Sequence, residues 1–233
     1  MSLESTEIKK NYKDLLGQIQ KATLASKALE PRIVAVSKKQ SIGKVKAVYE
    51  LGQRDFGESY CQEMEEKERE RVRLGLEGLR WTFVGRLQSN KIRKIVSLAS
   101  EVQSLGTFKH AELINRYAFE LKKNPYKVYL LVNSANEPSK GGFSWGELSS
   151  AQERIRSELP NLSVQGLMAI PPKVELERED KAFYEKLYAK IAKESRGVGL
   201  GLLSLGMSSD IELALRCGSD CLRVGSKIFG KRE

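Results

Sequence analysis

Short apolar runs alternate with longer amphipathic stretches along almost the whole chain. The run Ile33 to Val36 contains no polar residue, which is typical of a strand covered on both faces in a parallel sheet. Helical spacing of apolar positions predicts an additional helix before it, over residues 6–28. The strands predicted from such runs span residues 33–36, 54–57, 79–85, 102–105, 126–132, 164–170, 202–205 and 221–224.

Helix-like stretches separate these runs, so strands and helices alternate. Alternation of this kind predicts a parallel sheet, and eight units in 233 residues favour a closed (β/α)8 TIM barrel of the α/β class, one domain over residues 1–233. An open doubly wound sheet is the structural alternative. Among the predicted helices are 108–122, 145–159, 177–194 and 211–216, and a Glu- and Arg-rich helix ending at residue 73 that is expected to be solvated.

Polar side chains follow several of the predicted strands. The first apolar run ends at Ser37 and Lys38. A lysine withdrawn from water has its ammonium form disfavoured, and more of it is then the neutral amine that attacks aldehydes. Taken alone, Lys38 favours the start of a solvated turn, because surface lysines after strands are common, so the other strand ends must decide between the two interpretations.

Loops rich in glycine and serine follow the seventh and eighth predicted strands, where phosphates tend to bind in this type of barrel. The first contains Gly206, Met207 and Ser208, and the second contains Gly225 and Ser226. A capping-box pattern predicts that the neighbouring Ser209 caps the next helix, leaving Ser208 to face a ligand. With Lys38, and with Arg223 in the eighth strand, these loops predict a site for an aldehyde that carries a phosphate, and pyridoxal 5′-phosphate is the candidate cofactor.

Two glycine-rich segments have other interpretations. Gly197, Gly199 and Gly201 follow a helix and precede a strand, the reverse of a dinucleotide-binding loop, so a flexible turn is predicted. Turn formers at 133–142 predict a mobile loop. Lys140 in this loop is a candidate contact for cofactor entering or leaving, with a solvated lysine as the alternative.

Composition narrows the class of protein. No run of apolar residues is long enough to cross a membrane, and the polar N-terminus does not resemble a secretion signal, which predicts a cytoplasmic protein. Three cysteines and one histidine predict neither a structural metal site nor a disulfide framework. The formal charge of +10 favours anionic ligands, but the basic residues are spread along the chain, which makes nucleic acid a weak candidate partner.

Six segments, taken in order, resemble the pyridoxal phosphate homeostasis proteins, which are relatives of the alanine racemase N-terminal barrel. The resemblance implies that Lys38 carries the cofactor as an aldimine, that Met207, Ser208, Gly225 and Ser226 contact it at the phosphate side, and that Arg223 faces the pyridine nitrogen. Ser59 stands where this family usually has asparagine, and Ser226 where it usually has threonine. The segments are Ala35–Lys38, Gly52–Glu58, Val84–Lys91, Gly166–Pro172, Leu205–Asp210 and Arg223–Gly230.

Arg223 also bears on whether the protein is an enzyme. Arginine keeps its proton, so a pyridine nitrogen facing it stays unprotonated and the ring is a poorer electron sink. A binding protein that buffers or delivers pyridoxal phosphate is therefore expected, as a monomer or weak dimer, with other B6 vitamers and PLP-dependent apoenzymes as partners. The alternatives are a racemase or lyase using Lys38, and a nucleic-acid binder built on Arg86, Lys91, Arg93 and Lys94.

Overall fold

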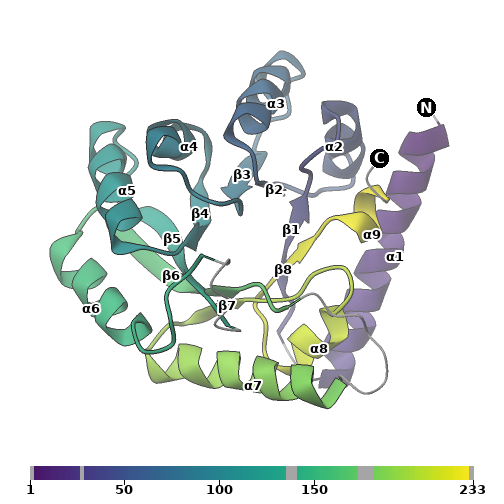
Figure 1. The fold of residues 1–233 in the computed structure, drawn as a ribbon. Coiled ribbons are helices and arrows are strands. Elements are labelled where there is room, and N and C mark those ends of the chain that lie inside the picture. The colour runs from purple at the N-terminus through teal and green to yellow at the C-terminus, as the bar shows by residue number, and fades with distance from the viewer. Residues whose placement is uncertain (1–2, 27–28, 135–140, 173–180, 231–233) are drawn as a thin grey trace.

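In a computed structural model the strands form a closed parallel barrel in the order β1 to β8, which confirms the predicted fold (Figure 1). The structure describes residues 3–26, 29–134, 141–172 and 181–230. The strands are β1 (Arg32–Val36), β2 (Asp55–Glu58), β3 (Arg80–Phe83), β4 (Glu101–Leu105), β5 (Tyr126–Val132), β6 (Leu162–Ala169), β7 (Leu202–Ser204) and β8 (Cys221–Val224).

Helices surround the barrel and connect its strands (Figure 1). Within the described residues they are α1 (Leu3–Ser26), α2 (Ile42–Tyr49), α3 (Cys61–Arg73), a 3-10 turn at Ser89–Lys91, α4 (Ile92–Leu98), α5 (Phe108–Glu120), α6 (Leu148–Glu158), α7 (Lys181–Gly197), α8 (Ile211–Arg216) and α9 (Ser226–Phe229).

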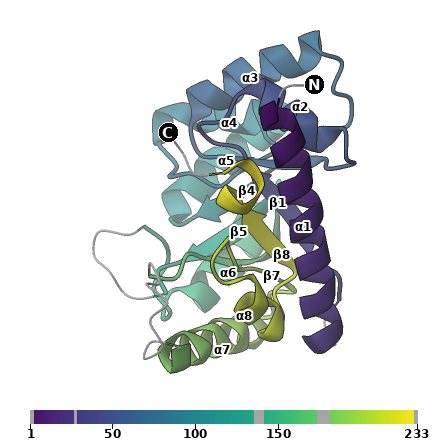
Figure 2. The same ribbon diagram turned by 90° about the vertical axis from the view of Figure 1, so that its right-hand side faces the viewer.

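The additional helix α1 packs along the outside of the barrel, beside α2, α8 and α9 (Figure 2). Its inward face buries Ile8, Leu15 and Ile19. The hydroxyl of Tyr12 donates to Gln53 Oε1 at 2.8 Å, and Gln53 Nε2 donates to the Asp55 carbonyl at 2.6 Å. Helix α1 is thereby joined to the start of β2.

Strand order places the loops of the predicted site side by side. Strand β8 closes the barrel against β1, with Val34 opposite Arg223 and Ala35 opposite Val224. All neighbouring strands are parallel, so their carboxyl ends share one face of the barrel. The residues that follow β1 and β8 therefore lie next to each other.

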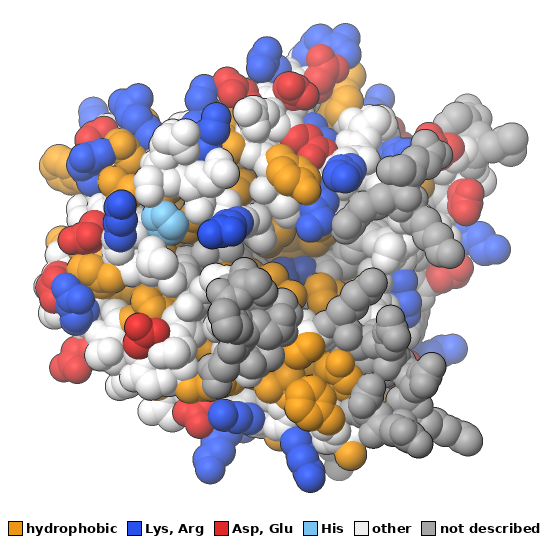
Figure 3. All heavy atoms as spheres, in the orientation of Figure 1, with side chains coloured by type: hydrophobic (Ala, Val, Ile, Leu, Met, Phe, Trp, Pro, Cys, Tyr) orange, Lys and Arg blue, Asp and Glu red, His pale blue; other side chains and the backbone are white. Residues whose placement is uncertain are grey.

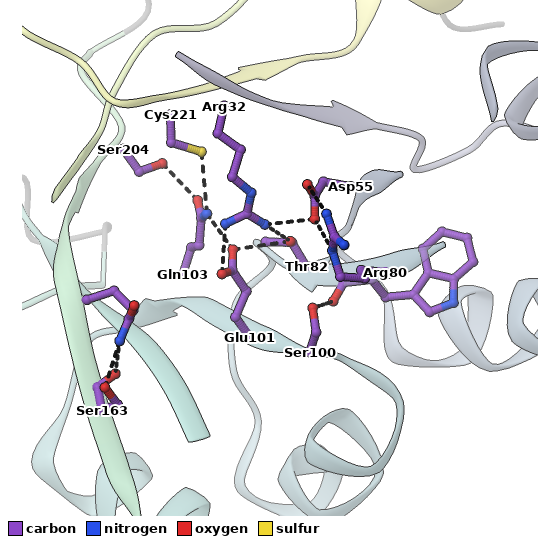
Figure 4. Close-up of polar contacts among 12 residues, drawn as sticks. Arg32, Asp55, Arg80, Thr82, Ser100, Glu101, Gln103, Ser163, Ser204 and Cys221 are labelled. Carbon is purple, nitrogen blue, oxygen red and sulfur yellow. Dashed lines mark hydrogen bonds and ion pairs between the residues drawn. The ribbon is translucent and has the colours of Figure 1, made fainter. Parts of the chain in front are cut away.

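The barrel interior contains a polar network, where barrels of this type mostly have branched apolar side chains. Arg32 NH1 donates to Glu101 Oε2 at 2.9 Å, and Arg32 NH2 donates to Asp55 Oδ1 at 3.1 Å (Figure 4). Arg80 pairs with both Asp55 oxygens from the same end of the barrel. Asp55 and Glu101 are buried, and burial of a carboxylate without such a partner would cost several kcal/mol, so the two arginines are required for these carboxylates to lie inside.

Several predicted boundaries are wrong for local reasons. The helix predicted over 145–159 begins at Leu148, because the Glu147 carboxylate accepts the Ser144 N–H at 2.8 Å and holds a turn there. Strand β3 is shorter than 79–85 and ends at Phe83, although the Val84 N–H still donates to the Glu58 carbonyl at 2.9 Å. Positions 177–180 and 135–140, Lys140 included, lie outside the described residues.

Three expectations from composition can be compared with the described residues. None of the described helices is long and apolar enough to cross a membrane. The described cysteines Cys61, Cys217 and Cys221 are unpaired, and the described part of the chain contains no group of three potential metal-ligating side chains.

Candidate functional site

Lys38 lies two residues beyond the end of β1, in the wall of a cavity of about 290 Å3. The Ser37 N–H donates to the Gly57 carbonyl at 2.9 Å, which continues the pairing with β2 up to the residue before Lys38. The lysine is half-buried. All six residues predicted to bind the cofactor line this cavity: Lys38, Met207, Ser208, Arg223, Gly225 and Ser226.

A buried ionic cluster holds the backbone on both sides of Lys38. Lys67, which is 6% exposed, donates to the Ser37 carbonyl at 2.6 Å and to Glu58 and Glu63 at 2.7 Å each. Glu63 in turn accepts the Lys39 N–H at 2.5 Å. The sequence predicted that the charged helix α3 is solvated. One of its lysines, Lys67, instead points inward and supports the backbone that carries Lys38.

Glu58 is the most deeply buried carboxylate of this cluster. It accepts the Ser37 hydroxyl at 2.6 Å, and its Oε2 has no hydrogen-bond partner among the described residues. Burial raises the pKa of Glu58 to about 7, against the lowering effect of Lys67 and Ser37. Ionisation of Glu58 is therefore coupled to the structure behind Lys38.

The loop after β7 is shaped by a glycine and an aspartate. Gly206 has φ of +101°, and a Cβ there would lie 2.6 Å from the Cβ of Ala214, so only glycine fits. The Asp210 carboxylate accepts the Met207 N–H at 2.6 Å and also the Tyr188 hydroxyl. These contacts turn Met207 and Ser208 toward the cavity.

The predicted capping role of Ser209 is wrong. Helix α8 begins at Ile211 with Asp210 in the cap position, and Ser209 is exposed. The Asp210 side chain is turned back to the Met207 amide, so it makes no capping hydrogen bond to its own helix. Ser208, by contrast, accepts the Lys227 N–H at 3.3 Å, which joins the loops after β7 and β8.

Arg223 enters the cavity from β8, 5% exposed. Its NH1 donates to the Ser204 hydroxyl at 2.6 Å and its NH2 to the Ala169 carbonyl at 2.8 Å, both neutral acceptors. Burial lowers the pKa of Arg223, but an arginine still keeps its proton at neutral pH. A guanidinium has five N–H donors, so donors remain for a ligand atom that accepts hydrogen bonds.

A chain of hydrogen bonds runs from Arg223 into the interior network. Ser204 donates to Gln103 Oε1 at 2.8 Å, and Gln103 Nε2 donates to Glu101 Oε1 at 2.8 Å (Figure 4). Every donor in this chain points toward the carboxylate. The cation at the cavity is thereby linked to the Glu101 anion, and the orientation of the Gln103 amide is fixed because only its NH2 group can face a carboxylate.

Sequence reasoning missed Glu58, Lys67, Gln103 and Ser204. The sequence carried one signal for Gln103. The polar residues Glu101 and Gln103 occupy alternate positions of β4, a strand whose residues are all buried. Ser59 and Lys38 line a neighbouring cavity of about 480 Å3. The Ser59 backbone is close enough to Gly85 that a Cβ there would lie 2.0 Å from the Ser59 carbonyl oxygen.

These features define a (β/α)8 barrel with a polar cavity at the carboxyl ends of β1, β7 and β8. Residues 8–233 match the family described as alanine racemase, N-terminal domain. The chain is 35% identical to the pyridoxal phosphate homeostasis protein of Caenorhabditis elegans, with coverage of 100% of this chain and 98% of that protein. The chain therefore belongs to the pyridoxal phosphate homeostasis protein family, and the resemblance indicated by its six motifs is confirmed.

Solved structures agree with this assignment. PipY of Synechococcus elongatus PCC7942, solved with PLP bound, has a TM-score of 0.81 at 29% identity, covering 96% of this chain and 100% of that chain. Alanine racemase of Corynebacterium glutamicum has a TM-score of 0.68 at 13% identity, covering 97% of this chain and 61% of that chain. The second comparison shows a shared fold alone.

Proposed function

We propose that this protein binds pyridoxal 5′-phosphate through Lys38 and acts in PLP homeostasis by buffering or delivering the cofactor. The observation that carries the proposal is the single cavity lined by Lys38, Ser208, Arg223, Gly225 and Ser226. The amine of Lys38 suits an aldehyde, the loops with Ser208, Gly225 and Ser226 suit a phosphate, and the buried donor Arg223 suits a pyridine nitrogen. PipY, a relative by structure, was solved with PLP bound.

Each residue has a definite role in this proposal. Lys38 binds the aldehyde carbon covalently, and the cluster around Lys67 holds its backbone in place. Ser208 and Ser226 donate hydroxyl hydrogen bonds to the phosphate, at the point where Gly206 and Gly225 allow close approach. Arg223 donates to the ring nitrogen. The bound cofactor would supply an electrophilic carbon and an electron-withdrawing ring.

We propose further that the protein is not an enzyme. Arg223 donates to the ring nitrogen without protonating it, so the ring withdraws electrons less strongly than one facing a carboxylate. An amino acid racemase or lyase using Lys38 is the alternative. Ordinary turnover of alanine or serine by purified protein would favour that alternative.

The proposed partners and location rest on the same site. PLP, which carries both an aldehyde and a phosphate, is the proposed main ligand, other B6 vitamers are proposed as further ligands, and PLP-dependent apoenzymes are the proposed recipients. Three unpaired described cysteines are consistent with a reducing cytoplasm. We treat residues 1–233 as one functional domain and expect a monomer or weak dimer.

Borohydride reduction tests the central claim. Purified protein incubated with PLP is expected to absorb at the boundary between ultraviolet and visible light. Borohydride reduction should remove this absorbance and leave the reduced adduct on the peptide that contains Lys38. Lys38→Ala is expected to abolish the adduct. Lys39→Asn is the matched control, because Lys39 has φ of +60°, which asparagine tolerates, and should keep it. An adduct that maps to another lysine would overturn the proposal.

A further inference from the structure

A second chamber of about 610 Å3 adjoins the cofactor cavity at the carboxyl ends of β3, β4, β5 and β6. The two cavities share Val84 and Ile170 in their walls. A third cavity, of about 480 Å3, is lined by both Lys38 and Arg86, and Arg86 also lines the chamber. The chamber therefore borders both cavities that Lys38 lines, and Lys38 itself lies outside the chamber lining.

The charge of the chamber favours an anionic group. No aspartate or glutamate occurs among the described residues that line it, and Arg86 lies exposed at its rim. His110 also lines it, and burial together with Lys109 lowers the pKa of His110. A guanidinium without competing acids in the same wall is suited to bind a carboxylate.

Much of the remaining wall is apolar, and polar side chains such as Asn133 and Ser134 complete it. Leu87, Val132 and Met168 are buried and form much of this wall. Ser134 is 7% exposed, and its Oγ has no hydrogen-bond partner among the described residues. A buried hydroxyl without a partner costs free energy, which a polar atom of a bound molecule would recover.

We propose that this chamber binds a free amino acid with an apolar side chain and that the amino acid triggers release of the cofactor. The inference rests on the proposed function. Arg86 binds the carboxylate, the apolar wall accommodates the side chain, and the amine is directed toward the carbon held by Lys38. The amine nitrogen would form a double bond to that carbon, the double bond from the carbon to Lys38 Nζ would break, and the two protons lost by the incoming amine would pass to Lys38, which would leave as a neutral primary amine. No oxidant or reductant is needed.

Release of cofactor from the loaded protein provides the test, with three compounds that separate the contributions. L-Leucine is expected to accelerate release at least about tenfold, measured by the change in absorbance and by PLP recovered after ultrafiltration. 4-Methylpentanoate lacks the amine, so it should release nothing and should slow release by leucine. 3-Methylbutylamine lacks the carboxylate and should accelerate release far less than leucine at the same concentration.

Variants assign the effect to the chamber. Arg86→Gln is expected to remove most of the acceleration by leucine and the binding of 4-methylpentanoate to unloaded protein, measured by calorimetry. Arg93→Gln removes an equal charge from the exposed side of α4, outside the chamber lining. This control should retain both the acceleration by leucine and the binding of 4-methylpentanoate. Equal acceleration by leucine and 3-methylbutylamine, or a full leucine effect in Arg86→Gln, would overturn the inference. Failure of the protein to take up PLP at all would instead contradict the proposed function.

Discussion

At the scale of single residues, the cofactor cavity depends on side chains that do not touch it. Arg223 is held by Ser204, Ser204 by Gln103, and Gln103 by Glu101, with all donors pointing in one direction. Hydrogen bonds in such a chain polarise one another, and a low dielectric strengthens them. Gln103 is therefore a positioning residue for the donor that faces the proposed ring nitrogen.

Replacing Gln103 tests this chain. Gln103→Leu leaves Ser204 without its acceptor and removes one of the donors to Glu101, which keeps Arg32 and Thr82, so we expect a loss of about 1 to 3 kcal/mol in unfolding free energy. Because Arg223 would lose its fixed orientation, we also expect faster loss of PLP and a shifted absorbance maximum. Gln165→Leu, which removes a hydrogen bond to Ser163 that does not lead to Arg223, is the control. A normal spectrum and release rate in Gln103→Leu would show that the chain has no positioning role.

The raised pKa of Glu58 predicts a pH dependence of stability. The native state retains this proton up to about pH 7, whereas the unfolded chain releases it near 4.5. Between these values the native state binds more protons, so the contribution of Glu58 to the unfolding free energy falls as the pH rises, and it is lowest above pH 7. The unfolding free energy of Glu58→Gln minus that of the wild type should therefore increase from pH 5 to pH 8. Urea unfolding at each pH measures this difference, and Glu77→Gln at an exposed position is the control. A difference that stays constant from pH 5 to pH 8 would contradict the raised pKa of Glu58.

At the scale of elements, periodicity predicted the strands and helices well because each is apolar on the face that packs. It failed at the start of α6, where the Glu147 side chain binds a backbone N–H, whereas the predicted bounds of α8 are the observed ones and only its cap residue differs. The inward lysine of α3 was not predictable either, since Lys67 stands in a run of charges and only the position of Glu58 on β2 explains its burial. The six residues predicted to bind the cofactor, by contrast, all line one cavity, because strand ends carry them in order. Other residues in the same lining were not predicted as site residues, namely Val36, Val84, Ile170 and Ser209.

Helix α1 offers a stability prediction at this scale. Leu15 is 2% exposed, whereas the adjacent Leu16 is 38% exposed. Leu15→Ala is expected to cost about 2 to 5 kcal/mol of unfolding free energy, from lost burial and the remaining cavity. Leu16→Ala should cost well under half as much. Equal losses in denaturant unfolding would indicate that α1 does not pack on the barrel through this face.

At the scale of the whole molecule, the charge pattern bears on the nucleic-acid alternative. Basic and acidic side chains are interspersed over the face shown in Figure 3. Lys94 pairs with Glu65 at 2.8 Å, and Arg93 pairs with Glu120 at 3.6 Å. Arg93 and Lys94, two of the four basic residues of the nucleic-acid alternative, are thus already paired with acidic side chains on other helices.

We therefore expect only weak, salt-sensitive binding to nucleic acid. The net charge of +10 should retain duplex DNA at low ionic strength, and this binding should disappear by about 150 mM salt, because contacts made by scattered cations are screened. The double variant Arg93→Gln, Lys94→Gln should weaken low-salt binding no more than Lys186→Gln, Lys193→Gln, which removes the same charge from exposed positions of α7. Fluorescence anisotropy against salt concentration measures both. Micromolar or tighter binding at 150 mM salt, lost only in the first variant, would establish a nucleic-acid surface on α4.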